Sequence, residues 1–346
     1  MIKLSMPVTV FAVMTLVGVA SAQVQISLGV RETGAGGGTF STIGGNGGAA
    51  GGIEWINKDG QTLNLDGTWQ KFTFKLTTDP VTGFAGSTAN GVLDGSFGTI
   101  EHVRILNTNG RTEPITLFID DISNTTTLGG TTTFGDFQGY QQGDEVIFQE
   151  PTYSGSTASN IVAGATSGVD NLVASRSASC RCDFQFVDGT ATRWLRLTTF
   201  NAKNQPNPLI RFDDNSVVEF WARAGDCQED LGFQGPGGAF AELCGTGMNG
   251  GETSVYDAAG APANAIGAFA LSVANQPDIA IFGGTLVSGN GLIFGLSVFA
   301  DPQGRLSFPL TGSPHLGELA VQTLFLDGST PHGIGFTNAI KVRLGQ

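Results

Sequence analysis

Carboxylates, tryptophans and cysteines are the residues of this sequence that could do chemistry. Asp120 and Asp121 lie at the end of an apolar run that reads as a β-strand, and Glu32 lies near the end of another. Carboxylate oxygens are ligands that calcium prefers in proteins. Asp120, Asp121 and Glu32 therefore predict a structural calcium site, and the alternative is that one aspartate caps a turn while the other is solvated.

The tryptophans could present a flat face to a sugar ring. Trp69 and Trp194 adjoin alternating strand patterns, where burial is the ordinary fate of an aromatic side chain. Trp55 and Trp221 are the better candidates for exposure. They are the predicted ligand-binding residues, with core packing as the alternative for each.

Four cysteines permit disulfides in an exported chain. Cys180 and Cys182 are two positions apart in a strand pattern, so both side chains point to one face, and a bond between them would be strained. Cys227 and Cys244 bracket a glycine-rich loop. A bond between these two would stabilise the fold by roughly 3 kcal/mol and is the favoured pairing.

Catalytic motifs are missing from the sequence. Glu54 and the Glu101-His102 pair could act as acids or bases, but no spacing fixes two carboxylates opposite each other as in a glycosidase. No P-loop, zinc-protease motif or nucleophile elbow occurs. The protein is therefore predicted not to be an enzyme, and a divergent glycoside-active enzyme is the least favoured alternative.

The first residues have the three parts of an export signal. Lys3 gives a positive start, residues 8–20 form an apolar run, and Ala20-Ser21-Ala22 is a small-residue cleavage site. Residues 1–22 are predicted to be a signal peptide, so the protein is expected to be extracellular or on the cell surface. No later run reaches the roughly 20 apolar residues of a membrane-spanning helix, so no transmembrane anchor is expected.

The net charge and the alternation of apolar residues indicate which partners and which fold class to expect. The net charge is −13 and clusters of lysine and arginine are absent, which disfavours nucleic acid as a partner. Apolar residues alternate over short segments separated by Gly, Asn, Asp and Ser, a pattern typical of all-β sandwiches. Strands are predicted at residues 24–30, 69–76, 101–106, 115–122, 145–148, 179–187, 193–200, 209–212, 217–222, 268–273, 292–299, 319–326 and 339–344.

The last segment, residues 227–346, resembles a C-terminal β-sandwich module of planctomycete-type secreted proteins. The resemblance is carried by Gly232-Phe233-Gln234-Gly235-Pro236-Gly237, Leu243-Cys244-Gly245, Gly283-Gly284-Thr285-Leu286-Val287 and Gly335-Phe336-Thr337-Asn338-Ala339. It implies a small β-sandwich appended to exported proteins, without a known chemistry.

Residues 23–226 resemble a galactose-binding-like jelly roll, a fold shared by many carbohydrate-binding modules. The carrying residues include Leu28-Gly29-Val30-Arg31-Glu32, Gly98-Thr99-Ile100-Glu101-His102, Ile119-Asp120-Asp121-Ile122, Gly143-Asp144-Glu145-Val146-Ile147-Phe148 and Trp194-Leu195-Arg196-Leu197. The two halves, 23–126 and 131–226, occur in reverse order. The domain is either circularly permuted or a truncated tandem copy, and permutation predicts that the strand at 24–30 pairs with the strand at 217–223.

These observations lead to a fold hypothesis and two main functional hypotheses. The fold is expected to be an all-β jelly-roll sandwich followed by a smaller β-sandwich. The first functional hypothesis is a non-catalytic secreted or cell-surface protein that binds a polysaccharide or cell-surface glycan. The second is a structural envelope or extracellular-matrix component without a ligand. Fold resemblance alone does not decide between them.

Overall fold

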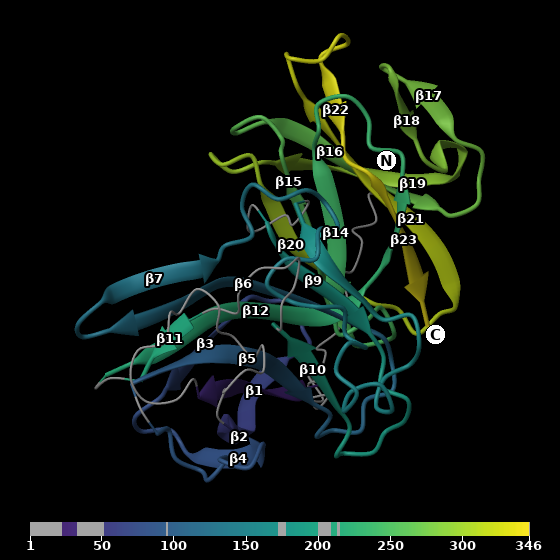
Figure 1. Cartoon of the computed structure of the whole chain (residues 1–346). Helices are drawn as coiled ribbons and strands as arrows, with labels where there is room; N and C mark the ends of the chain where they lie inside the picture. Colours follow the sequence, from purple (N-terminus) through teal and green to yellow (C-terminus); the bar gives the residue numbers. More distant parts are fainter. Residues whose placement is uncertain are drawn as a thin grey trace, which may run out of the picture.

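The computed structural model describes residues 23–32, 52–94, 96–171, 178–199, 209–212 and 215–345. In these ranges the chain forms β-strands joined by turns, with one short 3-10 helix at Gly289–Gly291 (Figure 1). The predicted all-β class is confirmed. The predicted signal peptide lies outside the described residues. Within them, no helix is long and apolar enough to cross a membrane.

The first sheet has six antiparallel strands in the order β10-β5-β1-β2-β4, with β11 also paired to β5. Its strands are β1 (Gln23–Glu32), β2 (Ile53–Asn64), β4 (Val81–Ala85), β5 (Phe97–Leu106), β10 (Trp194–Thr198) and β11 (Leu209–Arg211). Alternating apolar residues of β1, such as Val24, Ile26 and Leu28, are fully buried. This face of the sheet packs on the core, as the period of two in the sequence requires.

The second sheet has nine strands in the order β20-β15-β14-β12-β6-β9-β8, with β3 paired to β12 and β7 to β6. Its strands are β3 (Gln70–Lys75), β6 (Ile115–Thr126), β7 (Gly130–Gly135), β8 (Thr166–Asp170), β9 (Ser179–Phe184), β12 (Val217–Cys227), β14 (Phe240–Gly245), β15 (Thr253–Ala259) and β20 (Leu306–Thr311). Residues 217–225 of β12 pair with β3 and β6, whereas Asp226 and Cys227 pair with β14. The strand β12 thus connects the group of strands around β3 and β6 to the group around β14.

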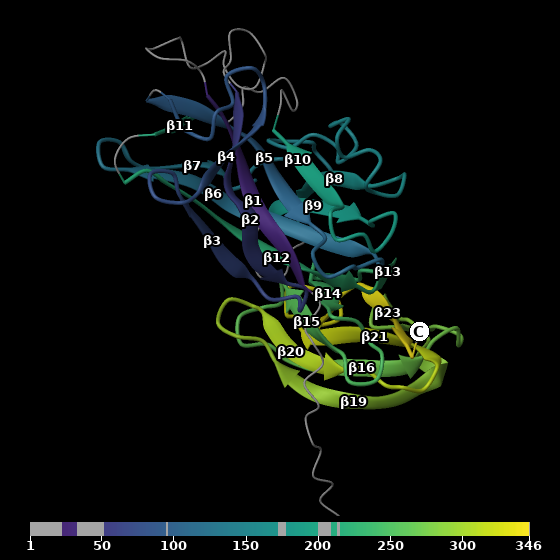
Figure 2. The same ribbon diagram turned by 90° about the horizontal axis from the view of Figure 1, so that it is seen from below.

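The third sheet has the order β13-β23-β21-β16-β19, with β22 paired to β21, and a separate hairpin joins β17 to β18. These strands are β13 (Glu229–Gly232), β16 (Ile266–Val273), β17 (Ile279–Ile281), β18 (Gly284–Leu286), β19 (Leu292–Phe299), β21 (Gly317–Leu326), β22 (Ile334–Phe336) and β23 (Ala339–Leu344). Figure 2 shows β13, β16, β19, β21 and β23 together with β14, β15 and β20 at one end of the molecule.

Two large hydrophobic cores and two small clusters lie within the described residues. The larger core runs from Val24 to Ala224 and takes side chains from both of the first two sheets. The smaller one runs from Ala239 to Val342 and includes Tyr256, Phe269 and Phe325. We call the parts around these cores the first unit and the second unit.

The strand pairing tests the expected permutation. The predicted pairing of residues 24–30 with 217–223 is wrong, because β1 pairs with β2 and β5 while β12 lies in the second sheet. The two halves are nevertheless interleaved: β10 and β11 pair with β5, and β9 and β12 pair with β6. They build one sandwich with a common core.

The strand predicted at residues 145–148 is also wrong, because this segment is a turn. Ile147 has a positive φ of 66°, which an extended strand does not allow. The N–H of Phe148 donates to the carbonyl of Val146 within the turn, at 2.7 Å. Three apolar residues in a row, Val146 to Phe148, are buried here by a turn instead of by a strand.

Candidate functional site

A polar groove of about 350 Å³ lies beside β8, the edge strand of the second sheet. Its walls are β8, Arg181 of β9 and the segment between residues 142 and 150. This segment is held against β8 by two backbone hydrogen bonds, from Gly143 N to Val169 O (2.7 Å) and from Val169 N to Asp144 O (2.8 Å). Gly168 permits the approach, because a Cβ atom there would lie 2.9 Å from the Gly143 carbonyl oxygen.

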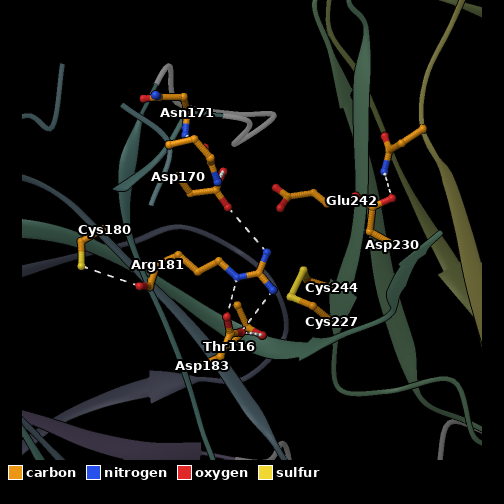
Figure 3. Close-up of polar contacts among 12 residues, drawn as sticks. Thr116, Asp170, Asn171, Cys180, Arg181, Asp183, Cys227, Asp230, Glu242 and Cys244 are labelled. Carbon is orange, nitrogen blue, oxygen red and sulfur yellow. Dashed lines mark hydrogen bonds and ion pairs between the residues drawn. A yellow bond between two sulfur atoms is a disulfide. The ribbon is translucent and has the colours of Figure 1, made fainter. Parts of the chain in front are cut away.

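Arg181 is the central charged group of the groove. Its Nε donates to Asp183 Oδ2 at 2.7 Å and its Nη2 donates to Asp183 Oδ1 at 3.2 Å, while Nη1 is 3.6 Å from Asp170 Oδ2 (Figure 3). Burial lowers the pKa of Arg181, but the hydrogen bond and the charges of Asp183 and Asp170 outweigh it and raise that pKa overall. The guanidinium is therefore a permanent cation held in a fixed orientation, although 41% of its side chain is exposed.

The two aspartates that hold Arg181 are themselves fixed. Asp183 Oδ1 accepts a hydrogen bond from the Thr116 hydroxyl at 2.6 Å, and Asp170 Oδ1 accepts one from Gln142 Nε2 at 3.3 Å. Asp170 is buried, whereas Glu145 and Glu150 on the other wall are exposed. The groove thus offers carboxylate and amide acceptors next to guanidinium and amide donors, at the edge of the second sheet.

A row of three side chains on neighbouring strands of the second sheet connects the groove to the second unit. Arg181 on β9 and Arg223 on β12 both stand opposite Phe118 of β6. Their guanidinium carbons lie 5.8 Å and 4.5 Å from the centre of that ring. Both distances are within the range of a cation–π contact.

Arg223 is buried and is the ionic link between the units. It pairs with Glu242 of β14 and, at 3.3 Å, with Asp257 of β15. Burial raises the pKa of Glu242, and the Arg223 charge opposes this shift without cancelling it. In Figure 3 the Glu242 carboxylate points toward the Asp170–Arg181 pair, so the second unit contributes negative charge beside the groove.

Trp55 is not an exposed sugar platform, and this prediction is wrong. Only 6% of the residue is exposed. Phe84 stacks on its ring at a centroid distance of 4.2 Å, and the guanidinium carbon of Arg104 lies 4.2 Å from the same centroid. Two groups this close to one centroid must occupy opposite faces of the ring, so neither face is available to a sugar.

Trp221 is half-buried and lies on the face of the second sheet that points away from the core. It alternates with the buried core residues Phe220 and Ala222 and stands opposite Lys71 of β3 and Asp120 of β6. Lys71 forms an ion pair with Glu219 at 3.0 Å, on the same face. Trp221 does not line the groove.

The predicted calcium ligands do not converge. Asp121 lies in a β-bulge of β6, where Asp121 and Ile122 stand opposite the single residue Phe220 of β12. Asp121 has a φ of 51°, and its N–H donates to Asp120 Oδ1 at 2.7 Å. Glu32 belongs to the first sheet, where its carboxylate accepts a hydrogen bond from the N–H of Asp94. Across the described ranges, no group of three or more His, Cys, Asp or Glu side chains is arranged to hold a metal. The three residues therefore do not fit a calcium ion.

The favoured disulfide is confirmed. Cys227 and Cys244 are bonded, and they stand opposite each other where β12 passes to β14 (Figure 3). Cys180 and Cys182 are free thiols that point into the larger core, on one face as the spacing predicted. Burial raises the pKa of Cys180 to about 12 and raises that of Cys182 well above its usual value. Both are structural residues.

The groove residues were not predicted from the sequence. Arg181 and Asp183 alternate with the two buried cysteines, which was a sign that they face outward. Their partner Asp170 comes from β8, a five-residue strand with glycine at its centre and no alternating pattern.

Comparison of the chain with protein-family models, with curated proteins and with solved structures found no match in any of the three.

Proposed function

We propose that this chain is an exported, non-catalytic protein that binds a glycan through the groove beside β8. The groove is the observation that carries the proposal. Asp170, Arg181, Gln142 and the two exposed glutamates supply donors and acceptors at the scale of a sugar ring. Sites for small polar ligands combine a concave shape with a few fixed polar groups.

The fixed orientation of these groups supports binding. Arg181 is restrained by two hydrogen bonds to Asp183, and Asp170 by Gln142, so little side-chain entropy is lost when a hydroxyl pair replaces water. Export is supported by the signal-like residues 1–22 and by the Cys227–Cys244 disulfide, which is stable in an oxidising compartment.

A glycan-array screen of the mature protein tests the proposal, with Arg181→Gln as the decisive variant. Arg193→Gln is the matched control, because Arg193 forms a similar two-point pair with Asp188 (3.0 and 2.6 Å) and does not line the groove. We expect at least about a tenfold loss of affinity for Arg181→Gln, which is the effect of one charged hydrogen bond, and no loss for the control.

Two results would count against a glycan-binding groove. Equal loss in both variants would mean that overall charge, and not the groove, controls binding. Silence across the array, for a folded wild-type protein, would favour a structural role in the envelope without a ligand. Because the described residues contain no group of carboxylates arranged to hold a metal ion, we expect the array pattern to be the same with and without calcium.

A further inference from the structure

A second cluster of polar side chains lies on the face of the first sheet that points away from the core. We call it the arginine cluster. Its members are Arg31, Trp55, Phe84, Glu101, His102, Arg104, Trp194 and Arg196. None of these residues lines the groove.

The sheet curls toward this cluster. Phe84 on β4 and Trp194 on β10 come from opposite edges, four strand steps apart, which is about 19 Å in a flat sheet. Their ring centroids are only 6.2 Å apart, and those of Trp55 and Trp194 are 5.6 Å apart. At the centre, Gly29 leaves room for the His102 ring, whose Cε1 would lie 2.0 Å from a Cβ atom. The aromatic rings from both edges therefore pack against one another on the outer face of the curled sheet.

The arginine cluster has more positive than negative charge. Glu101 is engaged by Arg31 through two hydrogen bonds of 3.1 Å. Arg104 and Arg196 stand directly opposite each other on β5 and β10, are 2% and 9% exposed, and form no ion pair with a described carboxylate. These two adjacent buried cations are thus not in direct contact with a described anion, and the charges of Asp59 and Glu101 act on Arg104 and Arg196, respectively, at longer range.

The cluster also has more hydrogen-bond donors than acceptors. The indole N–H of Trp55 donates to His102 Nε2 at 3.0 Å. Burial and the nearby arginines lower the pKa of His102, so the ring is neutral and has one lone-pair nitrogen. Its Nδ1 must then carry the proton, yet it faces Arg196 Nη2 at 3.4 Å, which is also a donor.

Further donors have no acceptor. The Nε atoms of Arg104 and Arg196 are buried without a hydrogen-bond partner. Arg196 Nη1 donates only to the hydroxyls of Ser154 (3.1 Å) and Ser156 (3.0 Å), which are neutral and weaker acceptors than a carboxylate. Buried unpaired cations are costly, and an apolar cluster of the same shape would be more stable.

We propose that the arginine cluster is a binding site for the anionic group of an acidic sugar, a uronate carboxylate or a sulfate ester. Arg104 and Arg196 bind the anion, and the rings of Phe84 and Trp194 contact the sugar. Phe84 and Trp194 are half-buried, which makes their side of the cluster the entrance. This site is separate from the groove and does not depend on it.

Titration calorimetry with the mature protein tests this site, using glucuronate, glucose 6-sulfate, neutral glucose and inorganic sulfate as probes. The decisive variant is Arg196→Gln. The control of equal charge is Arg193→Gln, at a half-buried arginine that is paired with Asp188. We expect the two acidic sugars to bind and glucose not to bind. In Arg196→Gln the affinity falls about 10- to 100-fold, the value of one lost charged hydrogen bond, and in the control it is unchanged.

Comparison of the two acidic sugars identifies which anion is preferred, and binding of either supports the site. Inorganic sulfate that binds as tightly as glucose 6-sulfate would overturn the part of the proposal that concerns the sugar. Failure of both acidic sugars to bind folded wild-type protein, or equal weakening in the control, would overturn the site itself. If Arg181→Gln still binds glucuronate, binding at the arginine cluster does not require the groove. A failure of the proposed glycan site in the groove would then leave this proposal intact.

A thermal melt without ligand distinguishes a binding site from a purely structural cluster. Since Arg196→Gln removes an unpaired buried charge, we expect its Tm to equal or exceed that of the wild type, as at sites that sacrifice stability for function. A lower Tm together with unchanged binding would assign Arg196 a structural role. Should this variant not fold, Arg196→Lys keeps the charge, and an affinity between those of wild type and Arg196→Gln is expected.

Discussion

Replacing Arg223 by methionine should destabilise the junction between the two units. Methionine keeps the apolar contact with Phe118 and removes the charge, so the variant isolates the ionic contribution. Glu242 and Asp257, the two carboxylates that Arg223 pairs with, are each only 11% exposed at the side chain. They would remain as two like charges without a cation between them.

The expected magnitude follows from this burial. Removing one partner of a buried ion pair costs about 3–5 kcal/mol, because the remaining charge is left uncompensated. Here two carboxylates lose the same partner, and the cation–π contact with Phe118 adds about 1 kcal/mol. We expect the free energy of unfolding at pH 7 to fall by about 4–6 kcal/mol.

The loss should depend on pH. Burial raises the pKa of Glu242, and without Arg223 that pKa rises further. A carboxyl group with a raised folded pKa contributes stability that is fully present below its unfolded pKa, about 4.3, and is lost as the pH rises through the folded pKa. The deficit of Arg223→Met is therefore smaller at pH 4 than at pH 7.

Urea denaturation at both pH values measures the difference. Arg343→Met is the control, since Arg343 pairs with Glu229 and Glu318 on the surface and should cost no more than about 1 kcal/mol. The combined variant Arg223→Met with Glu242→Gln should recover part of the loss. A deficit under about 1 kcal/mol at pH 7, or an equal deficit at both pH values, would refute the assignment of Arg223 as an ionic link.

Three further predictions concern stability and thiol reactivity. Replacing Cys227 and Cys244 by serine opens a loop with a sequence separation of 17 and should lower the free energy of unfolding by about 3 kcal/mol; a wild-type urea midpoint that reductant leaves unchanged would contradict this. Gly29→Ala places a methyl group 2.0 Å from the buried His102 ring and should cost about 1–3 kcal/mol, whereas an unchanged Tm would show that the ring can move aside. Cys182 is fully buried with a raised pKa, so a thiol reagent should modify it only at the rate of unfolding, and rapid labelling of the native protein would disprove its burial.

The sequence allowed the faces of single strands to be predicted, because a period of two is a local property. Phe72 and Phe74 are buried as their alternation required, and so are Cys180 and Cys182. The Cys227–Cys244 bond was favoured because these residues bracket a short loop. Each of these predictions needs only one segment of the chain.

The predictions that failed concern residues whose surroundings are set by a segment distant in the sequence. Trp55 is covered by Phe84 from β4 and Arg104 from β5, and neither neighbour can be read from the residues around Trp55. Asp120 and Asp121 were interpreted as metal ligands, but the second of them occupies a bulge that interrupts the pairing of β6 with β12. Sheet order and bulge position are long-range properties that local patterns do not contain.

The groove and the arginine cluster were missed for the same reason. Asp170 meets Arg181 only because β8 pairs with β9, and Arg104 meets Arg196 only because β10 pairs with β5. Outward-facing arginines in a strand pattern are common and are usually solvated, so their residue types alone gave no signal.

The passage of β12 from the first unit to the second has a mechanical consequence. Tension on the C-terminal strand β23 reaches β12 through β13, which pairs with β23 and directly follows β12 in the chain. The Cys227–Cys244 bond and the Arg223 ion pairs join β12 to the second unit at the same place. Such a joint resists hinge bending, since rotation would have to break a continuous ladder of backbone hydrogen bonds. We therefore expect the two units to move as one rigid body. Attachment of the C-terminal end to a surface would then fix the direction in which the groove opens.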